Sequence, residues 1–459
     1  MLMAARSWKF FLIAHVFSFS VAFGQQVNLS LKDALKRVEA NLPQLEAYRQ
    51  QALATKENIA LAKNSMVPEM NAGYQLNSAT FNNITGMSYP GFLLPISGPP
   101  SQTNEMNFVP GSALGTMVKW NPFTFGQRNA AVEKATATFK EANALYNEQL
   151  FRYEYSTLNV YLDAVYAMQV MNTIKAGIDR NKAGLDQSLV LASSGLKQGI
   201  DTVQFQAAIA QGEIDLLETE KVYIDKMTSL RNLTGIPEDT GKITLTDTAF
   251  SAQLQLSTDT ANHLTHPLYQ TISARQATTT AELKQLQKSF APQLDIWGNV
   301  YTRASGVDAN GNINKADGFQ FSRTNAGIGL QLNFPVLQFS KINIRKKQYN
   351  LLLKAGEASL QQADRDISAQ TQSALQQYEK DVQITDKTPA LLKASRDIYQ
   401  GLSISYEHGL IDYTRLAQAQ YDLIKAELNN ANAHLQLWRS LLRVAIAKGN
   451  LDIFLSQLK

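Results

Sequence analysis

The stretch Tyr406-Glu407-His408-Gly409-Leu410-Ile411-Asp412-Tyr413 separates two long amphipathic segments of the chain. Glycine commonly ends helices, because it adopts the left-handed backbone conformation without strain. The segment before the stretch, about 340–404, contains Pro389, which is expected to kink or interrupt a helix. The segment after it, about 413–447, contains no proline. The stretch therefore predicts a tight turn between a very long helix and a shorter one.

The shorter helix carries two apolar seams. At ~100° per residue, the mean directions of the seams lie roughly 140° apart. Such a helix has a neighbour on two sides and two free faces, as in a ring or sheet of helices, whereas a solid bundle needs one broad apolar face. A plain antiparallel coiled coil is the alternative. The first seam comprises Tyr421, Ile424, Leu428, Ala431, Leu435, Trp438, Leu442 and Ala445, and the second Leu416, Ala419, Leu423, Ala426, Ala433, Leu437 and Val444.

The landmarks around this turn occur twice in the same order, which indicates internal duplication. The matched pairs are Pro43 with Pro267, Pro68 with Pro292, 120–123 with 333–336, and the glycine breaks Gly199-Ile200-Asp201 and Gly409 to Asp412. The predicted first repeat is 25–262, with a turn near 195–201 and a linker at 236–262, and the second is 263–459. Further helices are expected at about 28–64, 127–194, 202–234 and 260–289.

Each repeat also contains two alternating stretches. They are about 69–80 and 111–121 in the first repeat, and 293–303 and 324–334 in the second. Their length and pattern match transmembrane β-strands of ~9–11 residues, although ordinary soluble hairpins are the alternative. Loops are expected at 81–110 and 304–323. The aromatic residues expected to form a membrane girdle are Tyr74, Trp120, Trp297, Tyr301 and Phe334.

The first residues predict export. Arg6 and Lys9 precede a mostly apolar run that ends in small residues near Gly24, so 1–24 is interpreted as a signal peptide. The run is shorter than the ~20 residues of a spanning helix, which disfavours a membrane anchor. No second apolar run of that length follows, so a membrane crossing would use strands. Four strands cannot close a barrel alone, because the smallest membrane barrels have about 8. Two copies of four strands would supply 8, and three copies would supply 12.

Composition argues against most chemistry. The 459 residues include no cysteine, which excludes disulfides, thiolate metal sites and acylation of an N-terminal cysteine. The formal charge of +4 gives no reason to expect nucleic acid as a partner. Asp308 to Asn312 begins like a calcium loop, but Ile313 stands where glycine is required, so a turn is expected. His263 and His266 lack companion ligands for zinc. We expect no enzyme activity, cofactor or metal.

The chain resembles the TolC family of outer-membrane efflux proteins. The resemblance rests on Leu31 to Leu35 with Asn41-Leu42-Pro43, the proline-bounded starts of the strands, and the paired turns, above all Tyr406 to Tyr413 followed by Leu416 to Gln420. It covers about 28–448. It implies a mainly α fold with a transmembrane β-barrel, and a homotrimer with a 12-stranded barrel in the outer membrane and a 12-helix tube in the periplasm. It also implies a periplasmic adaptor and an RND or ABC inner-membrane pump as partners.

The resemblance also implies functional residues at the turns, which would be the periplasmic tips of the tube. The residues expected at the tips and in adaptor docking are Leu196, Gly199, Ile200, Asp201, Gly409, Leu410, Ile411 and Asp412. Some family members close the tube with tip aspartates held by a tyrosine and an arginine. Tyr406 matches the tyrosine, Ile411 stands at the arginine position, and Arg415 and Gln418 stand at the aspartate positions. Asp201, Asp412 and Arg415 are therefore a candidate substitute network.

Two functions remain in competition on the sequence alone. The favoured one is a passive outer-membrane duct of a tripartite efflux or type I secretion system, gated at its periplasmic tip. The alternative is an exported structural coiled-coil protein of the cell envelope without a pore. Channel conductance and a heat-modifiable trimer distinguish the two.

Overall fold

The computed structural model describes residues 27–80, 82, 103–197, 199–248, 254, 263–308, 310–335 and 339–458. The expected signal peptide lies outside the described residues. The expected linker is described up to residue 248 and at residue 254, and the rest of it lies outside them. The chain divides into two compact units. The helical unit contains Met1–Glu46, Leu150–Ala261 and Ser368–Lys459, and the sheet unit contains Ala47–Gln149 and Asn262–Ile367. Each unit draws on both halves of the sequence, so the units are not the two sequence repeats.

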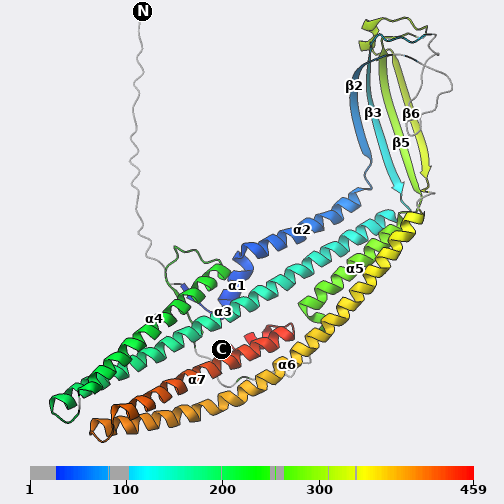
Figure 1. Cartoon of the computed structure of the whole chain (residues 1–459). Helices are drawn as coiled ribbons and strands as arrows, with labels where there is room; N and C mark the ends of the chain where they lie inside the picture. Colours follow the sequence, from blue (N-terminus) through cyan, green and yellow to red (C-terminus); the bar gives the residue numbers. More distant parts are fainter. Residues whose placement is uncertain are drawn as a thin grey trace, which may run out of the picture. The chain divides into compact units, whose positions relative to one another are not determined.

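Helices dominate the described structure (Figure 1). They are α1 Leu31–Asn41, α2 Pro43–Asn64, α3 Gln127–Ser193, α4 Ile200–Thr234, α5 Pro267–Lys288, α6 Phe339–Glu407, α7 Tyr413–Ala447 and α8 Asp452–Leu455, with 3-10 turns η1 His263–Thr265 and η2 Lys315–Phe319. The strands are β1 Val27–Leu29, β2 Glu69–Ala79, β3 Val109–Phe123, β4 Ile243–Leu245, β5 Gln293–Ser305 and β6 Arg323–Asn333. The order strand, strand, long helix, shorter helix thus occurs twice, as β2-β3-α3-α4 and β5-β6-α6-α7.

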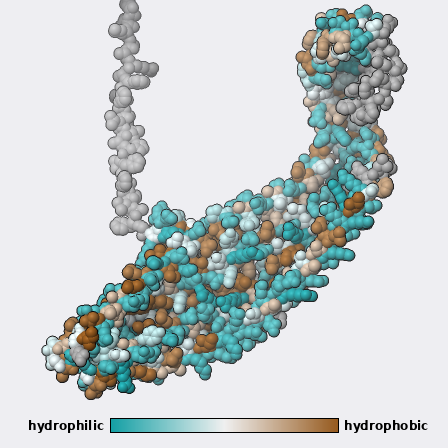
Figure 2. All heavy atoms as spheres, viewed as in Figure 1, coloured by the Kyte–Doolittle hydropathy of each residue, from teal (hydrophilic) through white to brown (hydrophobic). Residues whose placement is uncertain are grey.

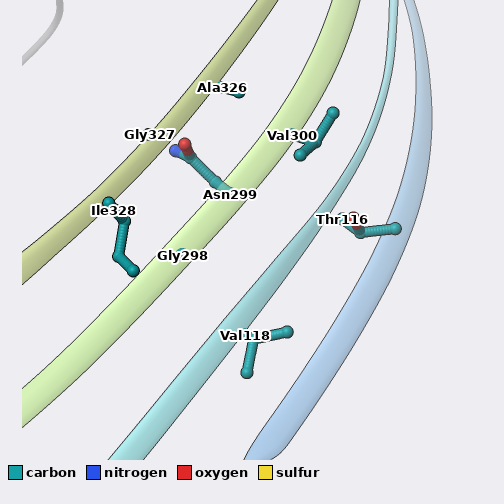
Figure 3. Close-up of a pocket in the computed structure, with 8 residues that line it drawn as sticks. All are labelled: Thr116, Val118, Gly298, Asn299, Val300, Ala326, Gly327 and Ile328. Carbon is teal, nitrogen blue, oxygen red and sulfur yellow. The ribbon is translucent and has the colours of Figure 1, made fainter.

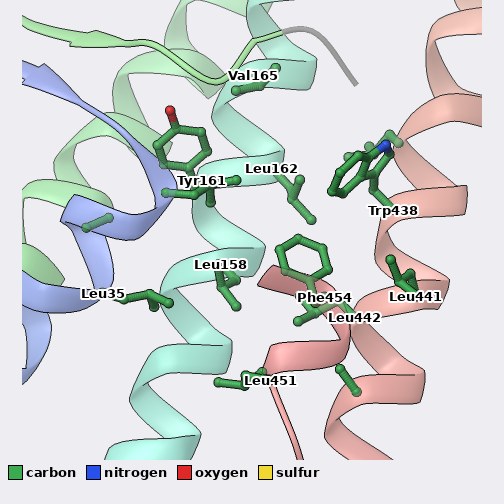
Figure 4. Packing of buried hydrophobic residues seen from close by; sticks show 14 of the residues in the cluster. Leu35, Leu158, Tyr161, Leu162, Val165, Trp438, Leu441, Leu442, Leu451 and Phe454 are labelled. Atoms are coloured by element: carbon green, nitrogen blue, oxygen red, sulfur yellow. The ribbon is translucent and has the colours of Figure 1, made fainter. Parts of the chain in front are cut away.

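The core of the helical unit forms where α7 and α8 pack on α3 and α1 (Figure 4). Trp438 of α7 and Phe454 of α8 meet edge to face, with ring centroids 5.4 Å apart. Leu158 and Leu162, one turn apart on α3, are fully buried in the same cluster. The second apolar seam of α7 is buried along its whole length, whereas the first seam is buried only from Leu435 onward. The part of the first seam nearer the turn is therefore not fully covered by the described residues.

A small parallel sheet closes the helical unit. β1 pairs with β4, from Val27 opposite Ile243 to Leu29 opposite Leu245. The hydroxyl of Tyr161 on α3 donates to the Leu29 carbonyl at 2.9 Å. The start of the expected linker is thereby fixed against the beginning of the described chain.

Helix α6 continues through Pro389, so of the expected kink or interruption the interruption does not occur. Proline removes the N–H that would bond the carbonyl four residues earlier, which is that of Thr385. The Thr388 hydroxyl donates to this carbonyl at 3.2 Å instead. A side-chain donor beside the proline therefore satisfies the acceptor that the helix would otherwise leave free.

The sheet unit is built on a four-stranded antiparallel sheet in the order β2-β3-β5-β6. β2 and β6 are its two edges, and β3 pairs with β5 across the two halves of the sequence. The register runs through continuous rows, such as Met70 opposite Val118, Val118 opposite Gly298, and Gly298 opposite Ile328. Directly paired residues share a face of the sheet, so these rows assign every side chain to one of two faces.

One face is apolar and carries no charged residue. This apolar face contains Met70, Ala72, Tyr74, Leu76, Leu114, Thr116, Val118, Trp120, Leu294, Ile296, Val300, Ala326, Ile328, Leu330 and Leu332. A shallow hollow at its centre is lined from β3, β5 and β6 (Figure 3). The hollow lies at Gly298, which has no side chain to fill it. It is therefore a gap in the pattern of apolar side chains rather than an enclosed cavity.

The other face is polar, and the register corrects the expected aromatic girdle. Tyr74 and Trp120 lie on the apolar face, but Trp297 is paired with Lys119 and Tyr301 with Gly115 on the polar face. A Cβ atom added at Gly329 would lie 2.5 Å from the Trp297 ring, so the indole covers this glycine. Alternation along β5 places these two aromatic residues on the opposite face from a lipid-facing belt.

Candidate functional site

The candidate site lies in the helical unit, where two helical hairpins end. The first hairpin is α3–α4 and the second is α6–α7, and their turns lie at 194–199 and 408–412. Gly195 has φ +70° and Gly409 has φ +74°. Leu196 N donates to Leu191 O at 3.0 Å, and Leu410 N donates to Ser405 O at 2.9 Å. Both long helices therefore end on a left-handed glycine followed by leucine, a common helix C-terminal motif.

Gly199 does not supply the left-handed residue that the sequence interpretation assigned to the first turn. Its φ of −65° and ψ of −7° are right-handed helical, and it caps α4. Gly195 ends α3 four residues earlier and leaves Gly199 free to begin the next helix. The dipeptide Gly-Leu is present at 195–196 and again at 409–410, but it also occurs within helices at 184–185 and 401–402, so it does not locate the turn by itself.

Tyr406 joins the second hairpin to the first. Its side chain is 1% exposed, and its hydroxyl donates to Asp201 Oδ2 of α4 at 3.0 Å. The ring meets Phe205 of α4 edge to face at 6.0 Å, and Phe205 meets Tyr413 at 4.6 Å. Burial raises the pKa of Tyr406, and the hydrogen bond and negative charge of Asp201 raise it further. The neutral tyrosine therefore remains the donor throughout the physiological pH range.

Two residues outside the predicted site support this junction. Lys197 donates through Nζ to the Ile411 carbonyl at 2.6 Å, and its ammonium lies 5.7 Å from the centre of the Tyr406 ring. A Cβ atom at Gly184 of α3 would lie 2.3 Å from the Phe205 ring, so only glycine leaves room for that ring. Neither contact has a local sequence signal, because each partner belongs to another helix or turn.

The remaining candidate gate residues are not brought together in one chain. Asp412 caps α7 by accepting from the Arg415 backbone N–H at 3.0 Å. Gln418 donates to Asp422, one turn along the same helix, at 3.2 Å. Among the described residues, the Arg415 guanidinium makes no ion pair with Asp201 or Asp412. Of the proposed gate set, the structure joins only Tyr406 and Asp201.

A second polar link connects the hairpins away from the turns. Arg180 of α3 donates to both carboxylate oxygens of Glu427 of α7, at 3.1 and 2.8 Å. Its guanidinium also lies 5.9 Å from the centre of the Tyr399 ring of α6. Gln420 of α7 donates to Asn181 Oδ1 of α3 at 2.9 Å. Paired ions and amides thus hold α3 against α7 beside the apolar cluster at the tips.

The turns themselves expose large apolar side chains. Leu196 is 70% exposed and Leu410 is 76% exposed. Ile200 and Val203, at the start of α4, are also exposed. Figure 2 shows hydrophobic residues at the ends of the hairpins beside more hydrophilic helix surface. Apolar residues gathered at a turn are typical of a contact surface for another protein.

Two further findings concern membranes and metals. No helix in the described part of the chain has both the length and the apolar character to cross a lipid bilayer. Among the described residues, no group of three or more His, Asp or Glu side chains is placed to hold a metal ion. His266 caps α5 by accepting from Leu268 N at 3.2 Å, and Asp308 accepts from Asn310 N and Asn312 N in a tight turn.

Comparisons with known proteins agree with this architecture. Residues 265–450 match the family model described as outer membrane efflux protein. No curated protein matches the chain. Among solved structures, it resembles the open-state MtrE outer membrane channel of Neisseria gonorrhoeae, with 15% identity, 98% of each chain covered and a TM-score of 0.71.

Two further structures give the same result. The chain is 12% identical to CusC, with 93% of each chain covered and a TM-score of 0.74. It is 14% identical to the outer membrane protein VceC of Vibrio cholerae, with 92% of this chain and 96% of that chain covered and a TM-score of 0.71. The fold is that of outer-membrane channels. The expected resemblance to the TolC family of outer-membrane efflux proteins is confirmed over residues 265–450 by the family model, and the fold agrees with it. This is a family of channels rather than of enzymes.

Proposed function

We propose that this protein is the outer-membrane channel of a tripartite efflux or type I secretion system, a passive trimeric duct that an adaptor and an inner-membrane pump open at its tips. The observation that carries the proposal is the sheet with one charge-free apolar face and two edges that no other described strand pairs with. Ile328 is 84% exposed and Leu330 is 73% exposed on that face. Such a surface is unfavourable in water and suits lipid.

The unpaired edges support assembly from several copies. An edge strand presents free N–H and C=O groups that readily pair with another chain. If β2 of one copy pairs with β6 of the next, every edge is satisfied, as lipid requires. Three copies of the four strands then supply the 12 strands that the family fold implies. The partly uncovered first seam of α7 gives the helical unit a matching surface for its neighbours.

The tips support the proposed gate and docking site. The bond between Tyr406 and Asp201 holds the second hairpin to the first, so breaking it frees one hairpin to move. Leu196, Ile200, Leu410 and Ile411, with the glycines and aspartates of the two turns, are the surface that we assign to the adaptor. No group for capturing energy is legible in the sequence, so transport energy comes from the pump.

Planar-bilayer recording tests the proposal. Purified protein should form discrete channels and migrate as a heat-modifiable trimer from outer-membrane fractions. A structural coiled coil would give neither result, and it would not account for the charge-free face of the sheet. Absence of both conductance and the trimer would overturn the duct.

A further inference from the structure

The charged residues of the sheet are distributed unevenly along its polar face. All charged side chains of β2, β3, β5 and β6 lie on this face. Near one end, Lys119 is paired in register with Glu69, and its ammonium lies 3.7 Å from Asp295 Oδ2. At the other end, Arg303 stands directly opposite Arg323. The first end places one cation beside two carboxylates, whereas the second places two cations side by side.

The acidic residues Asp308 and Glu105 of the adjoining loops form hydrogen bonds within their own loops. Within the described residues, neither guanidinium makes an ion pair. Asp308 accepts three hydrogen bonds from Asn310 and Asn312 in its own turn. Glu105 accepts from Asn107 N at 3.1 Å.

The two loops do not supply another partner. Asp317 belongs to η2, which lies over the opposite face, since Ser112 Oγ of the apolar face donates to the Gly318 carbonyl at 2.8 Å. Residues 81–102 contain no charged residue. The pair is therefore a local excess of positive charge on the polar face.

Two like charges directly opposite each other in a sheet destabilise it, unless an anion lies between them. Guanidinium groups bind carboxylate and phosphate oxygens well, because their donors form a planar fork. We propose that Arg303 and Arg323 form an anion-binding station at the loop end of the duct, which attracts anionic solutes and makes that end anion-selective. The proposal rests on the trimeric duct, in which three copies would place six guanidinium groups around one lumen and sum their field.

Bilayer recordings with a charged blocker test the station. Wild-type protein, Arg303→Gln/Arg323→Gln and Lys315→Gln are compared in neutral phosphatidylcholine bilayers under a KCl gradient, with inorganic pyrophosphate added to the loop side or the tip side. The control, Lys315, carries the same charge as each arginine but lies on η2 over the apolar face. We expect loop-side pyrophosphate to block the wild type and the control, and the double variant to need about tenfold more. Its chloride-to-potassium permeability ratio should fall about threefold.

Unchanged block and selectivity in the double variant would overturn the station. A second readout does not depend on conduction: in lipid-free detergent, pyrophosphate should raise the melting temperature of the wild type and of Arg303→Lys/Arg323→Lys, but not of the glutamine variant. If the wild type forms no channels, the duct proposal fails, and the melting experiment still decides whether the arginines bind anions. Stabilisation only by phosphatidylglycerol, without pyrophosphate block, would assign the pair to lipid headgroups and overturn the proposal.

Discussion

Tyr406 and Asp201 are joined by one hydrogen bond of 3.0 Å between two hairpins. Tyr406→Phe removes this bond and keeps the buried ring. A hydrogen bond to a charged group contributes about 1.5–3 kcal/mol, so under the proposed gate the closed tips lose about that much. We expect at least about a tenfold rise in open probability in planar bilayers.

Tyr413→Phe is the matched control for this experiment. The Tyr413 hydroxyl donates to the Gln204 carbonyl, at 3.3 Å and in an exposed position. Removing it should change open probability much less. Equal effects of the two substitutions would show that the Asp201 bond has no special part in closure.

Glu154 makes the stability of the helical unit depend on pH. Burial raises its pKa from 4.5 to about 7, with smaller contributions from the charges of Glu39 and Asp452. The folded state therefore holds this proton more tightly than the unfolded chain. Its stabilising contribution is complete below pH 4.5 and is lost as the pH rises through about 7. We expect Glu154→Gln to remove that loss, which is at most about 3 kcal/mol.

Denaturant unfolding at pH 5 and pH 8 measures this effect. The wild type should be less stable at pH 8 by a margin that the glutamine variant lacks. The same pH dependence in Glu154→Gln and the wild type would contradict the assignment.

Among single residues, the sequence predicted those that belong to the local pattern of the second turn. Tyr406 and Gly409 were predicted because the stretch around them is a helix break with a family pattern. Gly184 and Lys197 were missed as functional residues because their roles depend on which ring or carbonyl another element brings near. The Arg415 network stays a prediction: within the described residues, Asp412 accepts from the Arg415 backbone N–H as the cap of α7, and no ion pair joins the two side chains.

At the scale of elements, the two faces of the sheet make opposite predictions for the same substitution. Ile328→Lys places a charge on the apolar face, whereas Asn299→Lys, in the neighbouring strand, places it on the polar face. If the apolar face contacts lipid, the first costs about 2–4 kcal/mol near the membrane midplane and the second little. Refolding into vesicles with urea titration should separate the variants. Equal losses would show that the apolar face is not the lipid face.

Element boundaries were predictable where the sequence changes its period. Strands were expected at 293–303 and 324–334, and the structure has them at 293–305 and 323–333. The bounds differ by two residues at most, because the alternation of polar and apolar residues stops where the loops begin. An interruption at Pro389 was among the expectations because the rule for proline does not consider side-chain donors such as the Thr388 hydroxyl. Trp297 and Tyr301 were wrongly expected in the girdle because their positions along the strand were considered without the face of the sheet on which they lie. The pairing of β5 with β3 and β6 determines that face.

At the scale of the whole molecule, the proposed trimer predicts which apolar surfaces of one chain are covered by a neighbouring subunit. The first seam of α7 is buried at Leu435 and Trp438 but ends at Tyr421, which is 61% exposed. A seam that continues past its cover within the chain needs a second copy to complete it. We expect Tyr421→Glu to place a charge in that contact at a cost of at least about 1 kcal/mol per subunit. The trimer band should then dissociate at a lower temperature during electrophoresis.

Tyr421→Phe is the control at the same position, because it keeps the apolar ring and should keep the wild-type dissociation temperature. The comparison separates the subunit contact from the fold, since Tyr421 makes little contact within its own chain and circular dichroism of both variants should be unchanged. If Tyr421→Glu forms trimers as heat-resistant as the wild type, the exposed half of the seam does not face a neighbouring subunit. The ring of helices would then have to close through the exposed apolar residues of α4, such as Leu217 and Ile224, instead.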